Sequence, residues 1–263
     1  MKVEGRIVVV TGGAAGIGKA LCQRFVSEGA AKVIVADRAL GAAKAVAQQI
    51  GAEAFECDVS DEAQIIELVD RVETHHGPIA LFCSNAGIAV MDAEPGFAAS
   101  APNQAWQRSW EVNVMAHVYA ARTLVPRMAA RKEGYLLNTV SAAGLLSQID
   151  GAVYSVTKHA AIGFAESLAI THRAQGIRVS VLCPQGVDTP MLNAMTNGFQ
   201  ELDGVLTPEA VADCVMLGLV EERFLILPHP EVATYVKRKA DDYDRWLGGM
   251  IRLRNRVHAG PAP

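Results

Sequence analysis

The sequence of 263 residues lacks the features of several specialised protein classes. No apolar stretch reaches the roughly 20 residues that a membrane-spanning helix needs, and the first residues do not have the layout of a signal peptide. The net charge is only −4, which gives no reason to expect a nucleic-acid partner. No repeat, low-complexity segment or linker divides the chain. We therefore expect a cytoplasmic protein with a single domain over residues 1–263, and neither nucleic acid nor membrane as a partner.

The cysteines and histidines also do not form the patterns of disulfides or metal sites. The cysteine number is odd, and each cysteine lies inside an apolar run: Cys22, Cys57, Cys83, Cys183 and Cys214. Buried, reduced thiols explain this distribution better than disulfides or metal ligands. The seven histidines are scattered, with no HExxH motif and no His/Cys cluster. We expect no metal site.

Short apolar runs alternate with helical stretches along most of the chain. Runs typical of strands buried on both faces cover residues 6–10, 32–36, 53–57, 79–83, 135–139, 177–182 and 224–227. The longest helices are predicted over residues 104–131 and 152–175. This alternation predicts an α/β fold with one doubly wound sheet of about seven parallel strands, flanked by helices. The carboxyl ends of the strands would then meet at one edge, where such sheets bind ligands.

A glycine-rich turn follows the first strand. It contains, in order, Thr11, Gly12, Gly16, Ile17 and Gly18, and a helical stretch comes directly after it. Glycines let the backbone approach a pyrophosphate, and a helix N-terminus offers N–H groups and a favourable dipole. A tight turn without a ligand is the alternative, but the strand before and the helix after the turn favour a dinucleotide site.

Asp37 ends the second predicted strand, about 20 residues beyond the glycine turn. A carboxylate at this point can accept hydrogen bonds from the adenosine ribose and would repel a 2′-phosphate. NAD is therefore favoured over NADP. Arg38 could instead hold that phosphate, or stack on the adenine.

Two further polar motifs follow strands at the same predicted edge. Asp58-Val59 follows the third strand, and Asn85-Ala86-Gly87 follows the fourth. Ligand binding and ordinary turn or cap chemistry both remain open for them. The irregular residues 89–105 are either a surface excursion or part of a pocket wall.

Asn113 lies in the long predicted helix among apolar residues. Asparagine is a poor helix former, and a buried amide needs hydrogen-bond partners. An exposed position is one explanation, and a structural or catalytic polar network is another.

The stretch from Ser141 to Lys158 contains three residues suited to proton transfer. Ser141 follows a strand, and Tyr154 and Lys158 lie one turn apart on a predicted helix. An ammonium beside a phenol favours the phenolate. A Y-x-x-x-K pattern alone is expected by chance about once in several hundred positions. Its significance therefore depends on the neighbouring motifs.

The last third of the chain contains a loop, a candidate lid and a tail. The loop after the sixth strand contains Pro184, Gln185, Gly186, Val187 and Thr189. Residues 190–222 are expected to form a substrate lid, mobile over 190–206 and helical from Thr207. Residues 229–257 are expected to form a helical tail with basic and apolar residues. Membrane or partner binding is one interpretation of the tail, but its aspartates favour packing on the body or across an oligomer interface.

In this order, the motifs closely resemble those of the short-chain dehydrogenase/reductase family up to about residue 227. The matching positions are Thr11-Gly12-x-x-x-Gly16-x-Gly18, Asp37, Asp58-Val59, Asn85-Ala86-Gly87, Asn113, Ser141, Tyr154-x-x-x-Lys158 and Pro184…Val187-x-Thr189. The resemblance implies a Rossmann-type fold and a nicotinamide cofactor bound by these loops. It also implies hydride transfer between a secondary alcohol and its ketone, in a homotetramer or homodimer.

The family's roles carry over to the matching residues. Tyr154 would be the general base in alcohol oxidation and the general acid in ketone reduction. Lys158 would lower the pKa of Tyr154 and bind the nicotinamide ribose. Ser141 would hydrogen-bond the substrate oxygen, and Asn113 would hold a water of a proton relay.

Two positions depart from the family pattern. Ser84 stands where asparagine is common, and Gln185 stands where glycine usually follows Pro184, with Gly186 one place later. The bulkier Gln185 would alter the fit of the cofactor or place an amide in the substrate pocket.

The substrate pocket is expected to be mainly apolar with one or two amides, suited to a medium or bulky secondary alcohol. Its expected residues are Ser141, Leu146, Gln148, Tyr154, Gln185 and Met191, with Met195 nearby. Gln148 would either hydrogen-bond the substrate or merely end its loop. An NADPH-dependent carbonyl reductase and a non-catalytic NAD(H)-binding sensor or scaffold are the alternative functions, and the intact catalytic residues argue against the latter.

Overall fold

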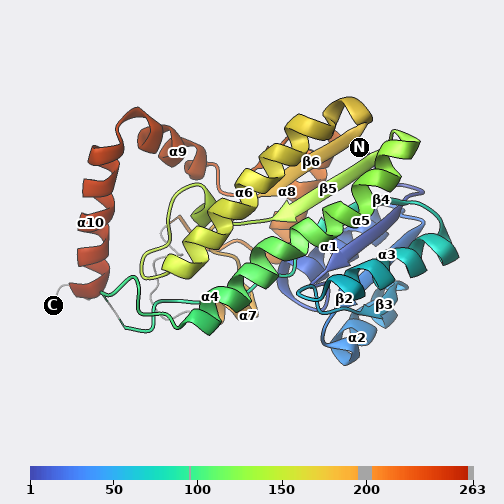
Figure 1. The fold of residues 1–263 in the computed structure, drawn as a ribbon, viewed down its shortest axis with the longest axis horizontal. Helices are drawn as coiled ribbons and strands as arrows, with labels where there is room; N and C mark the ends of the chain where they lie inside the picture. The colour runs from blue at the N-terminus through green and yellow to red at the C-terminus, as the bar shows by residue number, and fades with distance from the viewer. Residues whose placement is uncertain (95, 195–202, 260–263) are drawn as a thin grey trace.

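In a computed structural model that describes residues 1–94, 96–194 and 203–259, seven parallel strands form one sheet in the order β3-β2-β1-β4-β5-β6-β7 (Figure 1). The strands are β1 (Ile7–Thr11), β2 (Lys32–Asp37), β3 (Glu53–Glu56), β4 (Ile79–Ser84), β5 (Gly134–Thr139), β6 (Ile177–Leu182) and β7 (Leu225–Ile226). The predicted doubly wound α/β fold is confirmed. The strand order reverses between β1 and β4, which is the point where such sheets bind ligands.

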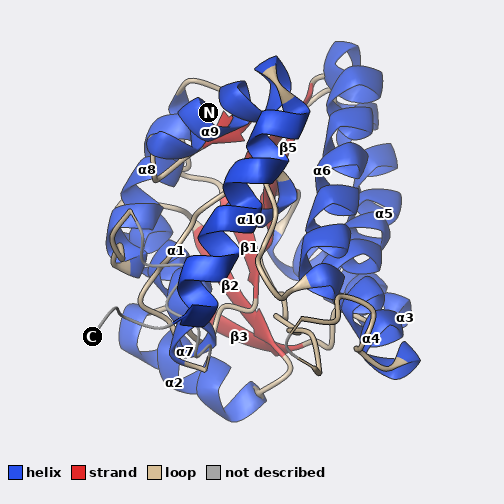
Figure 2. Cartoon of the chain, turned by 90° about the vertical axis from the view of Figure 1, so that its left-hand side faces the viewer, coloured by secondary structure: helices blue, strands red, loops and turns tan. Residues whose placement is uncertain are grey.

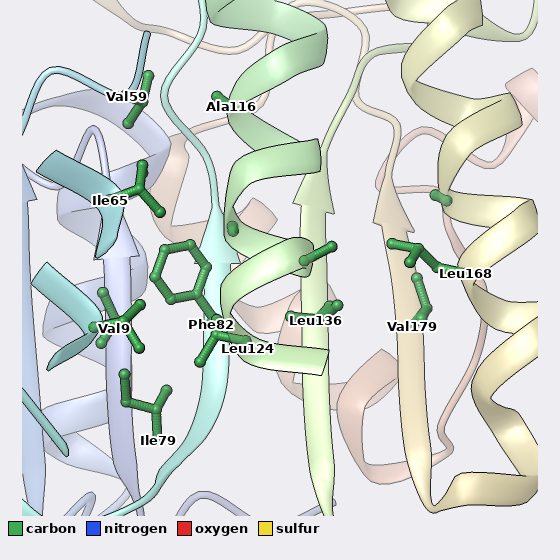
Figure 3. Close-up of a cluster of buried hydrophobic side chains, with 14 of the residues drawn as sticks. Val9, Val59, Ile65, Ile79, Phe82, Ala116, Leu124, Leu136, Leu168 and Val179 are labelled. Carbon is green, nitrogen blue, oxygen red and sulfur yellow. The ribbon is translucent and has the colours of Figure 1, made fainter. Parts of the chain in front are cut away.

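Helices cover both faces of the sheet. One face carries α1 (Gly16–Ser27), α2 (Leu40–Ile50) and α8 (Pro208–Val220), and the other carries α3 (Glu62–His76), α5 (Ala116–Arg131) and α6 (Ala152–His172). Figure 3 shows strand residues such as Val9, Phe82 and Val179 packed against Ile65 of α3 and Leu168 of α6. Because both faces are covered, the central strands are almost wholly apolar.

The long helix predicted over residues 104–131 is confirmed in extent, but a π-helical turn interrupts its regular α-helical geometry. The chain forms α4 (Asn103–Trp110), a π-helical turn (Glu111–Met115) and then α5, which continues through Pro126. The Asn113 side chain explains the π turn, because its amide pairs with backbone groups outside the helix. Such local widening is rare and recurs at functional sites.

The C-terminal tail is two helices rather than one, α9 (Glu231–Asp241) and α10 (Tyr243–Ala259). Asp242 between them is extended, with φ of −157°, and its Oδ1 accepts a hydrogen bond of 2.9 Å from the backbone N–H of Arg245. Asp242 therefore ends one helix and caps the next. Figure 2 shows α10 crossing in front of the carboxyl edge of the sheet.

The expected lid over residues 190–222 begins with the short helix α7 (Pro190–Asn193) and ends with α8, which the Thr207 hydroxyl caps as predicted. Residues 195–202, including Met195, lie outside the described residues. The lid stays a prediction.

Candidate active site

A cavity of about 1250 Å³ lies along the carboxyl edge of the sheet. Its lining includes most of the positions that the sequence singles out: Gly12, Gly16, Ile17, Asp37, Arg38, Asp58, Val59, Asn85, Ala86, Gly87, Ser141, Leu146, Gln148, Tyr154, Lys158, Pro184, Gln185, Val187, Thr189 and Met191. Thr11, Gly18, Asn113 and Gly186 do not line it. The first three lie directly behind the lining, where they hold it in place.

The glycine turn brings the backbone close to the neighbouring loop and to the cavity. Gly12 has φ of 65°, and a Cβ there would lie 2.9 Å from the Cα of Ala86. A Cβ on Gly18 would lie 2.1 Å from the carbonyl oxygen of Gly12, so α1 packs directly on the turn. No side chain caps α1 at Ala15, and Ala15 and Gly16 line the cavity. The N–H groups at the start of α1 are thus available to a phosphate, which is the fit that a dinucleotide requires.

Thr11 and Asn85 join the loops that follow β1 and β4. The Thr11 hydroxyl donates to the carbonyl of Cys83 (3.2 Å) and accepts from the backbone N–H of Asn85 (3.0 Å) and of Ala86 (3.2 Å). The Asn85 amide donates to the Thr11 carbonyl over 3.1 Å. Thr11 is buried, so its contribution is to fix the two loops that form the floor of the cavity.

Asp37 lies at the end of β2 with its carboxylate held by backbone groups. It accepts hydrogen bonds from the N–H of Ala14 (3.2 Å) in the glycine turn and from the N–H of Ala39 (2.9 Å). Asp37 and Arg38 both line the cavity. The carboxylate is therefore fixed beside the turn, where a ribose would lie if a phosphate binds at α1.

Asp58 forms an ion pair that sequence reasoning missed. Arg108 of α4 lies 3.1 Å from the Asp58 carboxylate, and Ser60 donates to the same carboxylate from its hydroxyl and its N–H. Burial opposes ionisation, but the bonds from Ser60 and Arg108 outweigh it and lower the pKa of Asp58. Arg108 also lines the cavity. Nothing in its local sequence indicates this contact across 50 residues.

Tyr154 and Lys158 are both buried and face the same part of the cavity. The Lys158 ammonium lies 5.6 Å from the centre of the Tyr154 ring and 3.4 Å from the carbonyl oxygen of Thr139. Burial lowers the pKa of Lys158 to about 8. Burial also raises the pKa of Tyr154, although the hydrogen bond with the Ser141 hydroxyl opposes this. In the chain alone desolvation outweighs the favourable contacts, and the lowering of the Tyr154 pKa by Lys158 together with the oxidised nicotinamide stays a prediction.

Asn113 forms the polar network that the sequence suggested as one of its two explanations. Its Oδ1 accepts from the N–H of Ile88 (3.0 Å), and its Nδ2 donates to the Ile88 carbonyl (2.9 Å) and to the Thr157 hydroxyl (3.2 Å). Asn113 and Thr157 are fully buried. The network joins the loop after β4, the π turn and the residue next to Lys158.

His117 lies one turn beyond Asn113 and was not singled out from the sequence. Its Nδ1 lies 3.1 Å from Oδ1 of Asn138, and burial lowers its pKa to about 4, with the Lys158 charge acting in the same direction. An unfolded chain protonates histidine near pH 6.5. Between about pH 6.5 and pH 4, His117 is protonated in the unfolded chain and neutral in the folded chain. Proton binding therefore favours the unfolded chain, and folding stability falls as the pH drops through this range.

We therefore expect His117 to contribute about 2 kcal/mol to the loss of stability between pH 7 and pH 5. His117→Gln should show a correspondingly smaller loss, because glutamine does not titrate. Urea unfolding of both proteins at the two pH values measures the difference. An equal loss in both proteins would contradict the assignment.

The loop after β6 supplies cavity-lining residues, with one exception. The family resemblance predicts that Gly186 contacts the cofactor, but Gly186 is buried and does not line the cavity. Its carbonyl instead accepts a hydrogen bond from the N–H of Leu206 (3.0 Å). Gln185 lines the cavity, and its N–H donates to Nδ1 of buried His229 (3.2 Å). The buried Oε1 of the Gln185 side chain has no hydrogen-bond partner among the described residues. Gln185 thus lies at the cavity, and both of its expected effects, on the fit of the cofactor or on the substrate pocket, stay predictions.

Gln148 lines the cavity from within the loop before α6, which continues to Gly151, so it does not end that loop. Its backbone N–H donates to the Ser155 hydroxyl (2.8 Å), and its side chain lies 3.4 Å from the Ile149 carbonyl. The long side-chain contact is weak, so the amide remains available to a ligand.

Two features are absent from residues 1–94, 96–194 and 203–259, which the structure describes. In these ranges no three or more His, Cys, Asp or Glu side chains form a group that could hold a metal ion. No helix there combines the length and the apolar character needed to cross a membrane.

Comparisons with known proteins identify the family of this chain. Residues 6–198 match the family model described as short chain dehydrogenase. The chain is 34% identical over 250 residues to 1-deoxy-11-beta-hydroxypentalenate dehydrogenase of Streptomyces exfoliatus, covering 92% of this chain and 90% of the relative. It is 31% identical over 239 residues to epidermal retinol dehydrogenase 2 of Mus musculus, covering 86% and 75%.

A solved structure shares the fold over nearly the whole chain. It is a short chain dehydrogenase/reductase from Burkholderia phymatum in complex with NAD, with a TM-score of 0.82 and 28% identity over 93% of this chain and 96% of that one. The chain belongs to the short-chain dehydrogenase family, as a nicotinamide-dependent oxidoreductase of alcohols or ketones.

Proposed function

We propose that the protein is an NAD-dependent dehydrogenase that interconverts a secondary alcohol and its ketone, with Tyr154 as general acid and base. One observation carries this proposal. The Tyr154 phenol, which lines the cavity together with Ser141 and lies one helical turn from Lys158, faces a cavity whose floor is the glycine turn. The same cavity thus holds a candidate proton-transfer group and a candidate dinucleotide site.

The residues that would hold the cofactor lie along the floor of the cavity. The N–H groups at the start of α1 would bind the pyrophosphate, Asp37 the adenosine ribose and Lys158 the nicotinamide ribose. When bound, the nicotinamide supplies the hydride acceptor or donor, and its positive charge in the oxidised form favours the Tyr154 phenolate.

The chain's own residues then move the proton. In alcohol oxidation, the Ser141 hydroxyl donates a hydrogen bond to the substrate oxygen, and the Tyr154 phenolate takes the hydroxyl proton. The Lys158 ammonium stabilises the phenolate across a buried, weakly screened gap. The buried network of Asn113 and Thr157 fixes the helix that carries Lys158, and Asn113 would hold the water that connects Lys158 to solvent and passes the proton outward.

A preference for NAD follows from the position of Asp37. Its carboxylate is fixed by two backbone N–H groups and would repel a 2′-phosphate. We expect kcat/KM with NAD to exceed that with NADP by at least about tenfold, which corresponds to about 1.4 kcal/mol. Asp37→Ser should remove most of this preference. Titration with both cofactors tests it, and a tenfold preference for NADP would show instead that Arg38 holds the phosphate.

A panel of secondary alcohols, scanned for NADH formation, tests the proposed reaction. Two relatives are named as dehydrogenases of 1-deoxy-11-beta-hydroxypentalenate and of retinol, which supports including bulky alcohols in the panel. NADH binding without any turnover would favour the non-catalytic sensor.

Cytoplasmic localisation and assembly into a homotetramer or homodimer stay predictions. Light scattering on the purified protein measures the assembly.

A further inference from the structure

Helix α10 forms the outer wall of the active-site cavity, opposite the carboxyl ends of the strands (Figure 2). Basic side chains of α10 and of the end of α9 attach both helices to residues 145–150, between Ser141 and Tyr154. Lys239 donates to the carbonyls of Leu145 (2.9 Å) and Leu146 (3.0 Å), and Arg254 lies 3.3 Å from the Asp150 carboxylate. The wall is therefore fixed to the loop that lines the substrate side of the cavity.

The face of α10 toward the cavity carries three arginines. Arg245, Arg252 and Arg256 are separated by seven and four residues, so they lie on one helical face, and Arg238 of α9 joins them. None of the four has a carboxylate within 4.0 Å in the part of the chain that the structure describes. This differs from Arg254 on the same helix, which pairs with Asp150.

The acids of the same wall are already occupied. Asp241 pairs with Lys237 at 3.1 Å, and Asp242 caps α10. Asp203 accepts a hydrogen bond of 2.9 Å from the Tyr235 hydroxyl. Among the residues that the structure describes, only Asp241 has a cationic partner. The carboxylates of Asp203 and Asp242 therefore offset part of the charge of the four arginines, and the wall keeps a net positive charge.

Apolar side chains line the same cavity as these arginines and the catalytic residues. Trp246, Met250 and Leu253 of α10 line the cavity together with Leu146 from the opposite loop. Arginine favours carboxylate and phosphate because its planar N–H groups bind two oxygens at once. The wall that α10 adds to the cavity thus combines apolar side chains with cationic ones.

We propose that the substrate is a secondary alcohol with an apolar body and an anionic group, most simply a carboxylate, remote from the hydroxyl. The arginines of α10 bind this anion while the hydroxyl reaches Ser141 and Tyr154. The inference rests on the proposed dehydrogenase function and adds a substrate class to it. A cofactor phosphate is the other anion that could reach the arginines, so the test must separate the two.

Secondary hydroxy fatty acids, with the hydroxyl one carbon from the methyl end, serve as probes from eight to sixteen carbons. Each acid is compared with its methyl ester, which keeps the length and removes the charge. We expect an optimum length at which the acid has a kcat/KM roughly tenfold above its ester, mainly through KM. Arg245→Gln and Arg252→Gln should remove this difference, and Arg252→Lys should restore part of it.

Arg71→Gln is the matched control, because this side chain is 62% exposed on α3 and does not line the cavity. It should leave the preference for the acid unchanged. Equal use of acids and esters at every length would overturn the inference. So would glutamine variants that raise KM for NAD and leave KM for the acid unchanged, because the arginines would then bind the cofactor.

Calorimetric titration of acids and esters into the protein saturated with NADH separates failure of the inference from failure of the proposed function. Tighter binding of acids that depends on Arg252, with no NADH formed from any alcohol, would support the anion site and overturn the dehydrogenase proposal. Turnover of neutral alcohols without tighter binding of acids would support the dehydrogenase proposal and overturn the anion site.

Discussion

Replacing Tyr154 with phenylalanine is expected to lower kcat for alcohol oxidation by roughly 10³-fold, within the range that general acid–base groups contribute. The side chain is only 8% exposed, and the change removes its hydroxyl while the packed ring remains. Without the phenol, no group takes the alcohol proton as hydride leaves. The affinity for NADH, measured by fluorescence titration, should stay within about twofold, because the loss concerns the transition state.

The pH dependence gives this prediction a second readout. Burial raises the pKa of Tyr154 in the chain alone, so the phenolate that accepts the proton becomes more abundant toward alkaline pH. The wild-type rate of alcohol oxidation should therefore rise with pH, and the residual rate of the variant should not follow this rise. Such a profile would distinguish loss of a base from general damage to the site.

Tyr135→Phe is the matched control. Tyr135 is also buried, and its hydroxyl lies 2.7 Å from the Ser180 hydroxyl, away from the cavity lining. Its removal should cost about 1 kcal/mol of stability and leave kcat unchanged. An unchanged rate of NADH formation by Tyr154→Phe would show that another group is the base.

The fold could be predicted from the sequence because its determinants are local. Each central strand is a short apolar run, and the residues after the strands must meet at one edge once the strands are parallel. Asp37, Asp58 and Asn85 were placed at the cavity by this reasoning alone. Their positions follow from chain order and strand polarity, and no long-range contact had to be known.

The parts that could not be predicted depend on pairs distant in the chain. The π turn at Asn113 follows from hydrogen bonds with Ile88, 25 residues away, and the Asp58–Arg108 pair spans 50 residues. Gly186 likewise accepts a hydrogen bond from Leu206, which is distant in the chain, and does not line the cavity. Local propensity carries no information about these partners.

The composition of the C-terminal tail predicted a helix but not what that helix contacts in the structure. Mixed basic and apolar residues predicted a helix, but not the break at Asp242 or which face meets the cavity. Those are fixed by Lys239 with residues 145–146 and by Arg254 with Asp150, contacts that span about a hundred residues. The same arginines that suggested a partner or membrane surface line the cavity.

Replacing Gly18 with alanine is expected to weaken NADH binding by roughly 100-fold and to cost about 1–3 kcal/mol of stability. An added Cβ would lie 2.1 Å from the carbonyl oxygen of Gly12 and 2.6 Å from Nδ2 of Asn85. The Gly12 carbonyl is backbone and cannot rotate away as a side chain would. Helix α1 must therefore move off the turn, which displaces the N–H groups proposed to bind the pyrophosphate.

Gly41→Ala separates this effect from the general consequence of adding a methyl group to a helix. Gly41 lies in α2, and a Cβ there would meet no atom within 4 Å, so this variant should gain about 0.5–1 kcal/mol and bind NADH normally. Fluorescence titration with NADH and urea unfolding on both variants measure the two effects.

A Gly18→Ala protein that binds NADH like the wild type would mean that close packing of α1 on the turn is not what positions the dinucleotide. A protein that loses stability but keeps NADH affinity would assign Gly18 to the fold alone. Loss of affinity in the folded Gly18→Ala protein, with none in Gly41→Ala, is the result that ties the glycine turn to the cofactor.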